Sequence, residues 1–174
     1  LRAPLPFICR SSDQSASVIP TSSSMRFMFM NSSEYSSAIF ETVLYISCSH
    51  VRSSAGVFSS SSGNSAFISD GDTNLLIDAG VSASKILNSL KEIGIGADEI
   101  DGILVTHEHS DHVAGIGVLA RRHNIPVYAN EPTMTAITKF FGNFPDNCIR
   151  IIKTGESFAI RSAVVRSFKT PHDS

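Results

Sequence analysis

The stretch Thr-His-Glu-His-Ser-Asp-His, residues 106–112, places three of the six histidines of this 174-residue chain and one aspartate within six positions. It follows Ile-Asp-Gly-Ile-Leu-Val, residues 100–105, a mostly apolar run that has the composition of a buried strand. In an extended segment, side chains two residues apart project to the same side, so His107 and His109 share a face. A helix beginning at about Asp111 then directs the last two residues of the stretch back toward the same pocket.

These residue types suit metal binding. Neutral imidazole is a ligand for zinc, manganese or iron, and a carboxylate adds charge for a second ion. The plain alternative is a polar loop in which the histidines are incidental. We interpret the stretch as metal-binding, with His107, His109, Asp111 and His112 as candidate ligands.

The residues around the stretch predict alternating strands and helices, which indicates a layered α/β domain. An Asp-Gly pair at residues 70–71 favours a hairpin between the first two strands. We expect strands at 65–69, 74–78, 100–105, 126–129, 149–152, 157–160 and 163–168, and helices at about 82–93, 111–122 and 131–141.

The composition changes along the chain. Of the 29 serines, 21 lie in residues 1–69. We expect residues 1–52 to be a Ser-rich extension, disordered or non-native, and residues 53–174 to form the folded domain. The net charge of −2 gives no overall basic field that would attract nucleic acid or a membrane.

No uninterrupted apolar run approaches the roughly 18 residues that a membrane helix needs, so we expect no membrane partner. The three cysteines are widely spaced and contain no Cys-x-x-Cys pair, so we expect no disulfide framework. A cytoplasmic location is the expectation that follows from these two features.

Several segments together resemble the metallo-β-lactamase-fold hydrolases, and within them the exonuclease-like YycJ/WalJ-type branch of bacterial proteins. The resemblance extends from about residue 56 to residue 174, and its motifs occur in the order of that family. They are Ser61-Ser-Gly-Asn64, Leu76-Ile-Asp-Ala-Gly80, the run from Ile103 to His112, Leu119-Ala-Arg-Arg122 with Pro126-Val-Tyr-Ala129, and Thr170-Pro-His-Asp173.

The resemblance implies an αββα sandwich of α/β (α+β) class, of which this chain would contain the first half. By position, His107, His109 and His172 would ligate one metal ion, and Asp111 and His112 would belong to a second. The implied cofactor is Zn²⁺ or Mn²⁺, with up to two ions in a complete domain. Asp78 would orient the metal-binding loop by hydrogen bonds.

The implied activity is hydrolysis by a metal-bound hydroxide, with Asp111 as the catalytic residue that orients the water. We expect a phosphodiesterase or exonuclease with nucleic acid as its substrate. One alternative is a thioesterase or lactamase of the same fold. Another is a truncated, non-catalytic metal-binding fragment, since no residue here matches the later aspartate and histidine of the family. Such a fragment would self-associate through an uncovered sheet face.

The segment Ser-Ser-Gly-Asn at residues 61–64 has two interpretations. Its hydroxyl and amide groups can present hydrogen-bond donors to a phosphate. It is also the composition of an ordinary tight turn between two strands.

Overall fold

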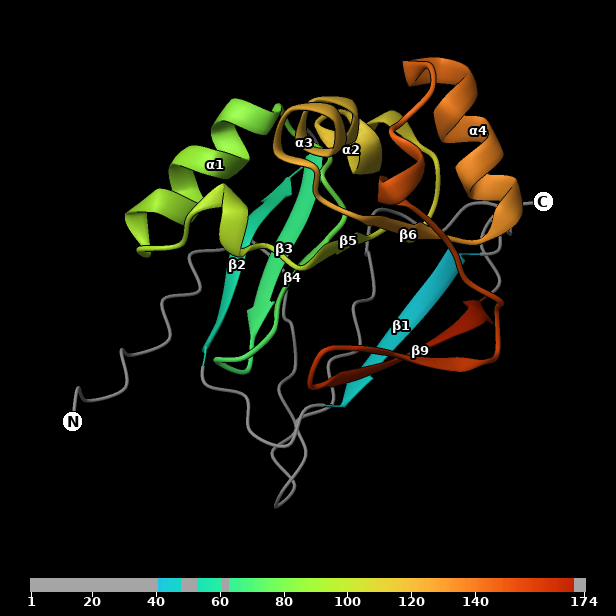
Figure 1. Ribbon diagram of the computed structural model, residues 1–174, viewed down its shortest axis with the longest axis horizontal. Helices are drawn as coiled ribbons and strands as arrows, with labels where there is room; N and C mark the ends of the chain where they lie inside the picture. Colours follow the sequence, from blue (N-terminus) through green and yellow to red (C-terminus); the bar gives the residue numbers. More distant parts are fainter. Residues whose placement is uncertain (1–40, 48–52, 61–62, 171–174) are drawn as a thin grey trace.

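The computed structural model describes residues 41–47, 53–60 and 63–170. Figure 1 shows the helices together on one side of a sheet, with a second, smaller sheet on the other side. The layers are therefore helices, larger sheet and smaller sheet, and the expected layered α/β architecture is confirmed. Among the described residues, no helix is long and apolar enough to cross a bilayer.

The larger sheet has six strands in the order β2-β3-β4-β5-β6-β7. The pairs from β2 to β4 are antiparallel, and those from β4 to β7 are parallel. The carboxyl ends of the parallel strands therefore meet at one edge of the sheet. The strands are β2 (Ser53–Ser60), β3 (Gly63–Ser69), β4 (Asn74–Ile77), β5 (Gly102–Leu104), β6 (Val127–Ala129) and β7 (Ile149–Ile151).

The smaller sheet has the order β1-β9-β8, with both pairs antiparallel. Its strands are β1 (Glu41–Ser47), β8 (Ser157–Ile160) and β9 (Ala163–Thr170). Strand β1 lies within residues 1–52, so this segment departs from the expectation of an extension outside the fold. Its run of β-branched and aromatic residues favours a strand, and its partner β9 is more than a hundred positions away in the sequence. The rest of residues 1–52 lies outside the described residues.

The helices are α1 (Ala83–Glu92), α2 (Ser110–Val113), α3 (Ile116–His123) and α4 (Glu131–Phe141), with short 3-10 helices η1 (Ala97–Glu99) and η2 (Asp146–Cys148).

The single helix expected over 111–122 is wrong, because the structure breaks it into α2 and α3 at Gly115. The amide of Gly115 donates to the carbonyl oxygen of Ala79 at 2.7 Å. A Cβ at Gly115 would come within 2.5 Å of the Val81 carbonyl oxygen, so glycine permits this close approach.

Alternate residues of the central strands of the larger sheet point in opposite directions, and those strands bury residues on both faces. Phe67 and Leu76 pack in the core beneath the helices. Ile68, Leu75 and Leu104 pack in a second core that faces the smaller sheet. In that second core they meet Ile160 of β8 and Ala163 and Val165 of β9.

Candidate metal centre

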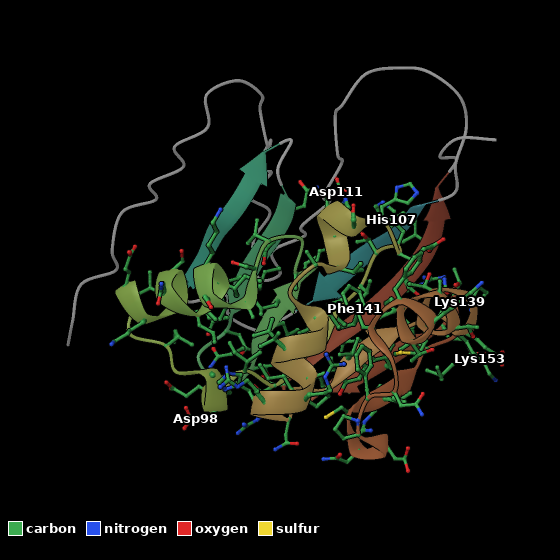
Figure 2. All side chains as sticks on the ribbon, turned by 90° about the horizontal axis from the view of Figure 1, so that it is seen from above. Asp98, His107, Asp111, Lys139, Phe141 and Lys153 are labelled. Carbon is green, nitrogen blue, oxygen red and sulfur yellow. The ribbon has the colours of Figure 1, made fainter. Side chains whose placement is uncertain are left out.

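The candidate residues follow the carboxyl end of β5, where the chain runs through an extended loop into α2. Parallel pairing continues one step beyond the strand, with the Val105 amide donating to the Tyr128 carbonyl oxygen at 2.9 Å. His109 then precedes the first turn of α2, in extended backbone conformation. Figure 2 shows His107 and Asp111 at the same edge of the molecule, on opposite sides of this turn.

Asp78, directly after β4, joins the neighbouring strand end to this loop. Its φ of 59° is in the left-handed region, and only 4% of the residue is exposed. Its Oδ1 accepts from the Thr106 amide at 2.8 Å. Its Oδ2 accepts from the Thr106 hydroxyl at 2.8 Å and from Nδ1 of His112 at 2.7 Å. A strained, buried aspartate therefore ties both ends of the loop together.

These hydrogen bonds define which nitrogen of each imidazole carries the proton. Nδ1 of His112 donates to the Asp78 carboxylate, and in the neutral ring Nε2 then carries the lone pair. The Thr106 hydroxyl donates its hydrogen bond to Asp78, so the hydroxyl oxygen is left to accept from Nδ1 of His107 at 3.0 Å. Nε2 then carries the lone pair of His107 as well. Carboxylate and hydroxyl partners of this kind orient histidines that bind metal.

Three backbone segments meet behind the side chains. The Ala79 amide donates to the His112 carbonyl oxygen at 2.8 Å, and the Gly80 amide donates to the Asn64 carbonyl oxygen at 2.7 Å. A Cβ at Gly80 would lie 1.6 Å from the Asp111 carbonyl oxygen. Glycine is therefore required here, and the close packing places α2, β3 and the end of β4 in fixed relation.

The side chains of the motif lie near one another on one side of this junction. The ring centroids of His107 and His109 are 4.6 Å apart, and those of His107 and His112 are 3.9 Å apart. Oδ2 of Asp111 lies 3.5 Å from Nε2 of His112. Two donor atoms of a tetrahedral ion with bonds of about 2.1 Å are separated by about 3.4 Å. The Asp111–His112 pair therefore has the donor chemistry and the spacing of two ligands to one ion.

Among the residues that the structure describes, no three His, Cys, Asp or Glu side chains converge in an arrangement that could enclose an ion. His172, the expected third ligand beside His107 and His109, lies outside the described residues. The other four expected residues lie together, with His107 and His112 buried and His109 and Asp111 more exposed.

Two residues for which the sequence assigned no definite role belong to this cluster. Thr106 connects Asp78 to His107, and the signal that could have found it is its hydroxyl directly before the first histidine. Asn64, from β3, places its side-chain nitrogen 3.2 Å from Oδ2 of Asp111 and 3.0 Å from Nε2 of His112. The Ser-Ser-Gly-Asn segment drew attention to Asn64 in the sequence, but the sequence did not show that this side chain lies beside Asp111 and His112.

The sequence model described as "Metallo-beta-lactamase superfamily" matches residues 60–169, more than half of the chain. Exodeoxyribonuclease YycJ of Bacillus anthracis is 40% identical over 115 residues, which are 66% of this chain and 44% of that protein. Exodeoxyribonuclease WalJ of Streptococcus pneumoniae is 40% identical over 117 residues, with the same two coverages. The chain therefore spans less than half the length of these curated relatives.

The fold is also similar to solved structures. One, described as the first B3 metallo-beta-lactamase with an active-site glutamic acid, superposes with a TM-score of 0.50 and 28% sequence identity. The superposition covers 59% of this chain and 44% of that one.

Proposed function

Because the chain belongs to the metallo-beta-lactamase superfamily, we propose that His107, His109, Asp111 and His112 hold divalent metal ions in a metal-dependent hydrolase. The observation that carries this proposal is the pair of oriented imidazoles at the end of β5. Asp78 and Thr106 hold their Nδ1 atoms, so that Nε2 of each imidazole carries a lone pair. His172 is proposed, from its position in the family motif alone, as a further ligand.

The proposed substrate is a phosphodiester of nucleic acid, and the proposed reaction is exonuclease cleavage with Zn²⁺ or Mn²⁺. Support comes from the 40% identity to two proteins named exodeoxyribonucleases. Because this chain matches 44% of each, the activity of those proteins is carried over here as a proposal.

Bound divalent ions would supply a water of lowered pKa and polarise the scissile bond. The protein's own contribution is to position the groups around that water. Asp111 is 44% exposed at its side chain, which allows its carboxylate to orient the attacking water and accept its proton. Asp78 fixes His112 from behind, and the Thr106 hydroxyl fixes His107, so neither ring needs to reorient during the reaction.

A second candidate is hydrolysis of a lactam or thioester at the same centre. The observation that favours it is the superposition with a metallo-beta-lactamase at 28% identity. The loops that select a substrate differ between enzymes of one fold, so the shared architecture alone does not choose between the two.

The test compares three substrates with the full chain in the presence of Mn²⁺ or Zn²⁺: single-stranded DNA, bis(p-nitrophenyl) phosphate and an acyl thioester. We expect turnover of the two phosphodiesters and none of the thioester. His107→Ala should abolish that turnover. His123→Ala is the matched control, because His123 ends α3 and is not one of the proposed ligands.

Turnover of the thioester alone would replace the proposed substrate by the second candidate. Retained metal without turnover of any substrate would contradict the hydrolase proposal for this chain. Phosphodiester turnover that persists in His107→Ala would contradict the assignment of the site.

A further inference from the structure

A groove lies between the two sheets, at the end of the larger sheet that β6 and β7 form. Figure 1 shows β9 beneath β6, on the side of that sheet opposite β2. The groove has a volume of about 430 Å³, which is within the range of small-molecule sites. Its lining includes Tyr128, Arg150, Lys153, Glu156 and Phe158, and none of the candidate ligands among the described residues.

Two aromatic rings in the lining of this groove join the sheets. The rings of Tyr128 and Phe158 are nearly parallel, with an angle of 11° between their planes and centroids 5.7 Å apart. Both are partly buried and pack against the core between the sheets, which holds them in a fixed orientation. Because both line the groove and are partly exposed, their aromatic surface is accessible to a planar ligand.

The polar groups beside the rings are hydrogen-bond donors. Arg150 pairs in register with Tyr128 on the neighbouring strand, so the two side chains share one face of the sheet. Burial raises the pKa of Tyr128, although the Arg150 guanidinium beside it opposes that shift, so the hydroxyl keeps its proton at neutral pH. Nη1 of Arg150 donates to the Ile149 carbonyl oxygen at 2.9 Å. A guanidinium carries five N–H groups, so Arg150 keeps donors for a further acceptor.

The charges that line the groove favour an anion. Arg150 and Lys153 supply two positive charges and Glu156 supplies one negative charge, so the lining is positive in a chain of net charge −2. Nζ of Lys153 lies 3.8 Å from Glu156, but both side chains are well exposed, and such a pair contributes little. Lys153 follows the carboxyl end of β7, at the edge of the sheet that also carries the candidate centre.

We propose that this groove binds a single strand of nucleic acid, with a base against the Tyr128–Phe158 pair and phosphates at Arg150 and Lys153. Aromatic surface next to cations is the combination by which proteins hold the bases and phosphates of single strands. The inference rests on the proposed function, because the strand held in the groove would be the one that the candidate centre cleaves.

An extended peptide paired with the edge of β7 is another class of partner for such a place. The Ile152 amide donates to the Ala129 carbonyl oxygen on β6, so the backbone polar groups of Ile149 and Ile151 point away from the sheet. The guanidinium of Arg150 already donates to the Ile149 carbonyl oxygen. A paired peptide would have to displace it, so the observations favour nucleic acid.

The experiment measures binding of a fluorescein-labelled oligothymidylate of about twelve nucleotides to the full chain by fluorescence anisotropy. EDTA prevents cleavage, and the salt concentration is varied. Arg150→Gln and Lys153→Gln each remove one cation of the groove. Lys91→Gln is the matched control, because Lys91 lies in the last turn of α1, on the side of the molecule away from β6 in Figure 1.

The salt dependence of binding reports the phosphate contacts. Loss of one contact should make the slope of log K against log[salt] shallower by about 0.7. We expect this change for Arg150→Gln and for Lys153→Gln, and the wild-type slope for Lys91→Gln.

A second pair of variants tests the aromatic surface. Phe158→Leu removes the ring and keeps an apolar side chain, and Phe140→Leu makes the same change at a residue of α4 that is 75% exposed. Loss of base stacking should weaken binding by Phe158→Leu at least about fivefold and leave its salt slope unchanged. Phe140→Leu should bind like wild type. Circular dichroism checks that Phe158→Leu folds, and the two charge variants decide the test if it does not.

Unchanged salt slopes in both Arg150→Gln and Lys153→Gln, or no binding of the strand by wild type, would overturn the inference. If the chain hydrolyses phosphodiesters in that case, the proposed function stands. Competition by thymidine monophosphate as effective as by the unlabelled strand would replace the strand with a free nucleotide, and preference for an acidic peptide would replace it with a peptide. Either result overturns the inference. The expected slopes together with no hydrolysis of any substrate would support the inference and contradict the proposed function.

Discussion

Nδ1 of His112 lies 2.7 Å from Oδ2 of Asp78, and the side chain of each is only 6% exposed. The two residues are 34 positions apart in the sequence and come from the ends of different elements, β4 and α2. This bond fixes the orientation of the His112 ring and connects the strand end to the helix start. The candidate centre is therefore built around Asp78, which is not itself among its proposed ligands.

Asp78→Asn should destabilise the fold, because a buried carboxylate that accepts three hydrogen bonds is replaced by a neutral amide. We expect the free energy of unfolding to fall by about 2–4 kcal/mol. Chemical denaturation checks this. Asp98→Asn is the matched control, since Asp98 is exposed and lies far from His107 in Figure 2. Equal unfolding midpoints for the two variants would refute the role given to Asp78.

Thr106→Val should weaken metal binding and lower the free energy of unfolding by about 1–2 kcal/mol. The substitution keeps the shape of the side chain and removes the hydroxyl that links Asp78 to Nδ1 of His107. Loss of such an orienting partner weakens metal affinity by about 10–100-fold. Calorimetric titration with Zn²⁺ measures the effect, and Thr135→Val, on the exposed side of α4, is the control. An unchanged affinity would show that the hydroxyl does not orient His107.

Gly80→Ala should destabilise the fold far more than Gly94→Ala. A Cβ at Gly80 would overlap the Asp111 carbonyl oxygen at 1.6 Å, whereas at Gly94 nothing lies within 4 Å. Gly94 has a φ of +81°, so alanine there should cost about 1 kcal/mol from backbone strain alone. We expect a loss of at least about 3 kcal/mol at Gly80, or failure to fold. Thermal melts of the two variants compare them, and a similar melting temperature would contradict the close packing.

Ser162→Ala should lower the free energy of unfolding more than Arg161→Ala does. The Ser162 hydroxyl donates to Oδ2 of buried Asp70 at 2.7 Å and lies 2.6 Å from the Thr73 hydroxyl, which connects the turn between β8 and β9 to the larger sheet. We expect Ser162→Ala to cost about 1–2 kcal/mol in urea unfolding.

Arg161 pairs with Asp101 at 3.0 Å, but its side chain is 64% exposed, and pairs in water contribute little. Arg161→Ala should therefore unfold at a urea concentration close to that of wild type. The reverse order of the two variants would show that the surface ion pair, and not the buried hydroxyl, connects the sheets.

Periodicity in the sequence located most of the described elements of the fold. Glu131–Phe141 has the expected bounds of a helix, and the Asp-Gly pair lies between β3 and β4 as expected. The αββα family fold inferred from the motifs is confirmed by the family match and the structural similarity. Strand β1 was not expected because its short β-prone run lies in Ser-rich sequence and its partner β9 is more than a hundred positions away. The break at Gly115 was missed because it arises from a tertiary contact with Ala79.

For the candidate centre, the sequence supplied the residue types but not their connections. The spacing of His107, His109, Asp111 and His112 places them on one loop and one helical turn, so local geometry was enough to bring them together. The contact of Asn64 with Asp111 spans 47 positions and depends on the pairing of whole strands. The direction of each imidazole proton could not be inferred from spacing, since it follows from the partners at Nδ1.

The most direct test of the central claim is the zinc content of the purified full chain after equilibrium dialysis, measured by plasma mass spectrometry for wild type, His107→Ala, His112→Ala and His123→Ala. The account predicts that wild type and His123→Ala retain zinc and that His107→Ala and His112→Ala lose most of it. Equal zinc contents in all four proteins, or none in wild type, would contradict a metal centre at the end of β5.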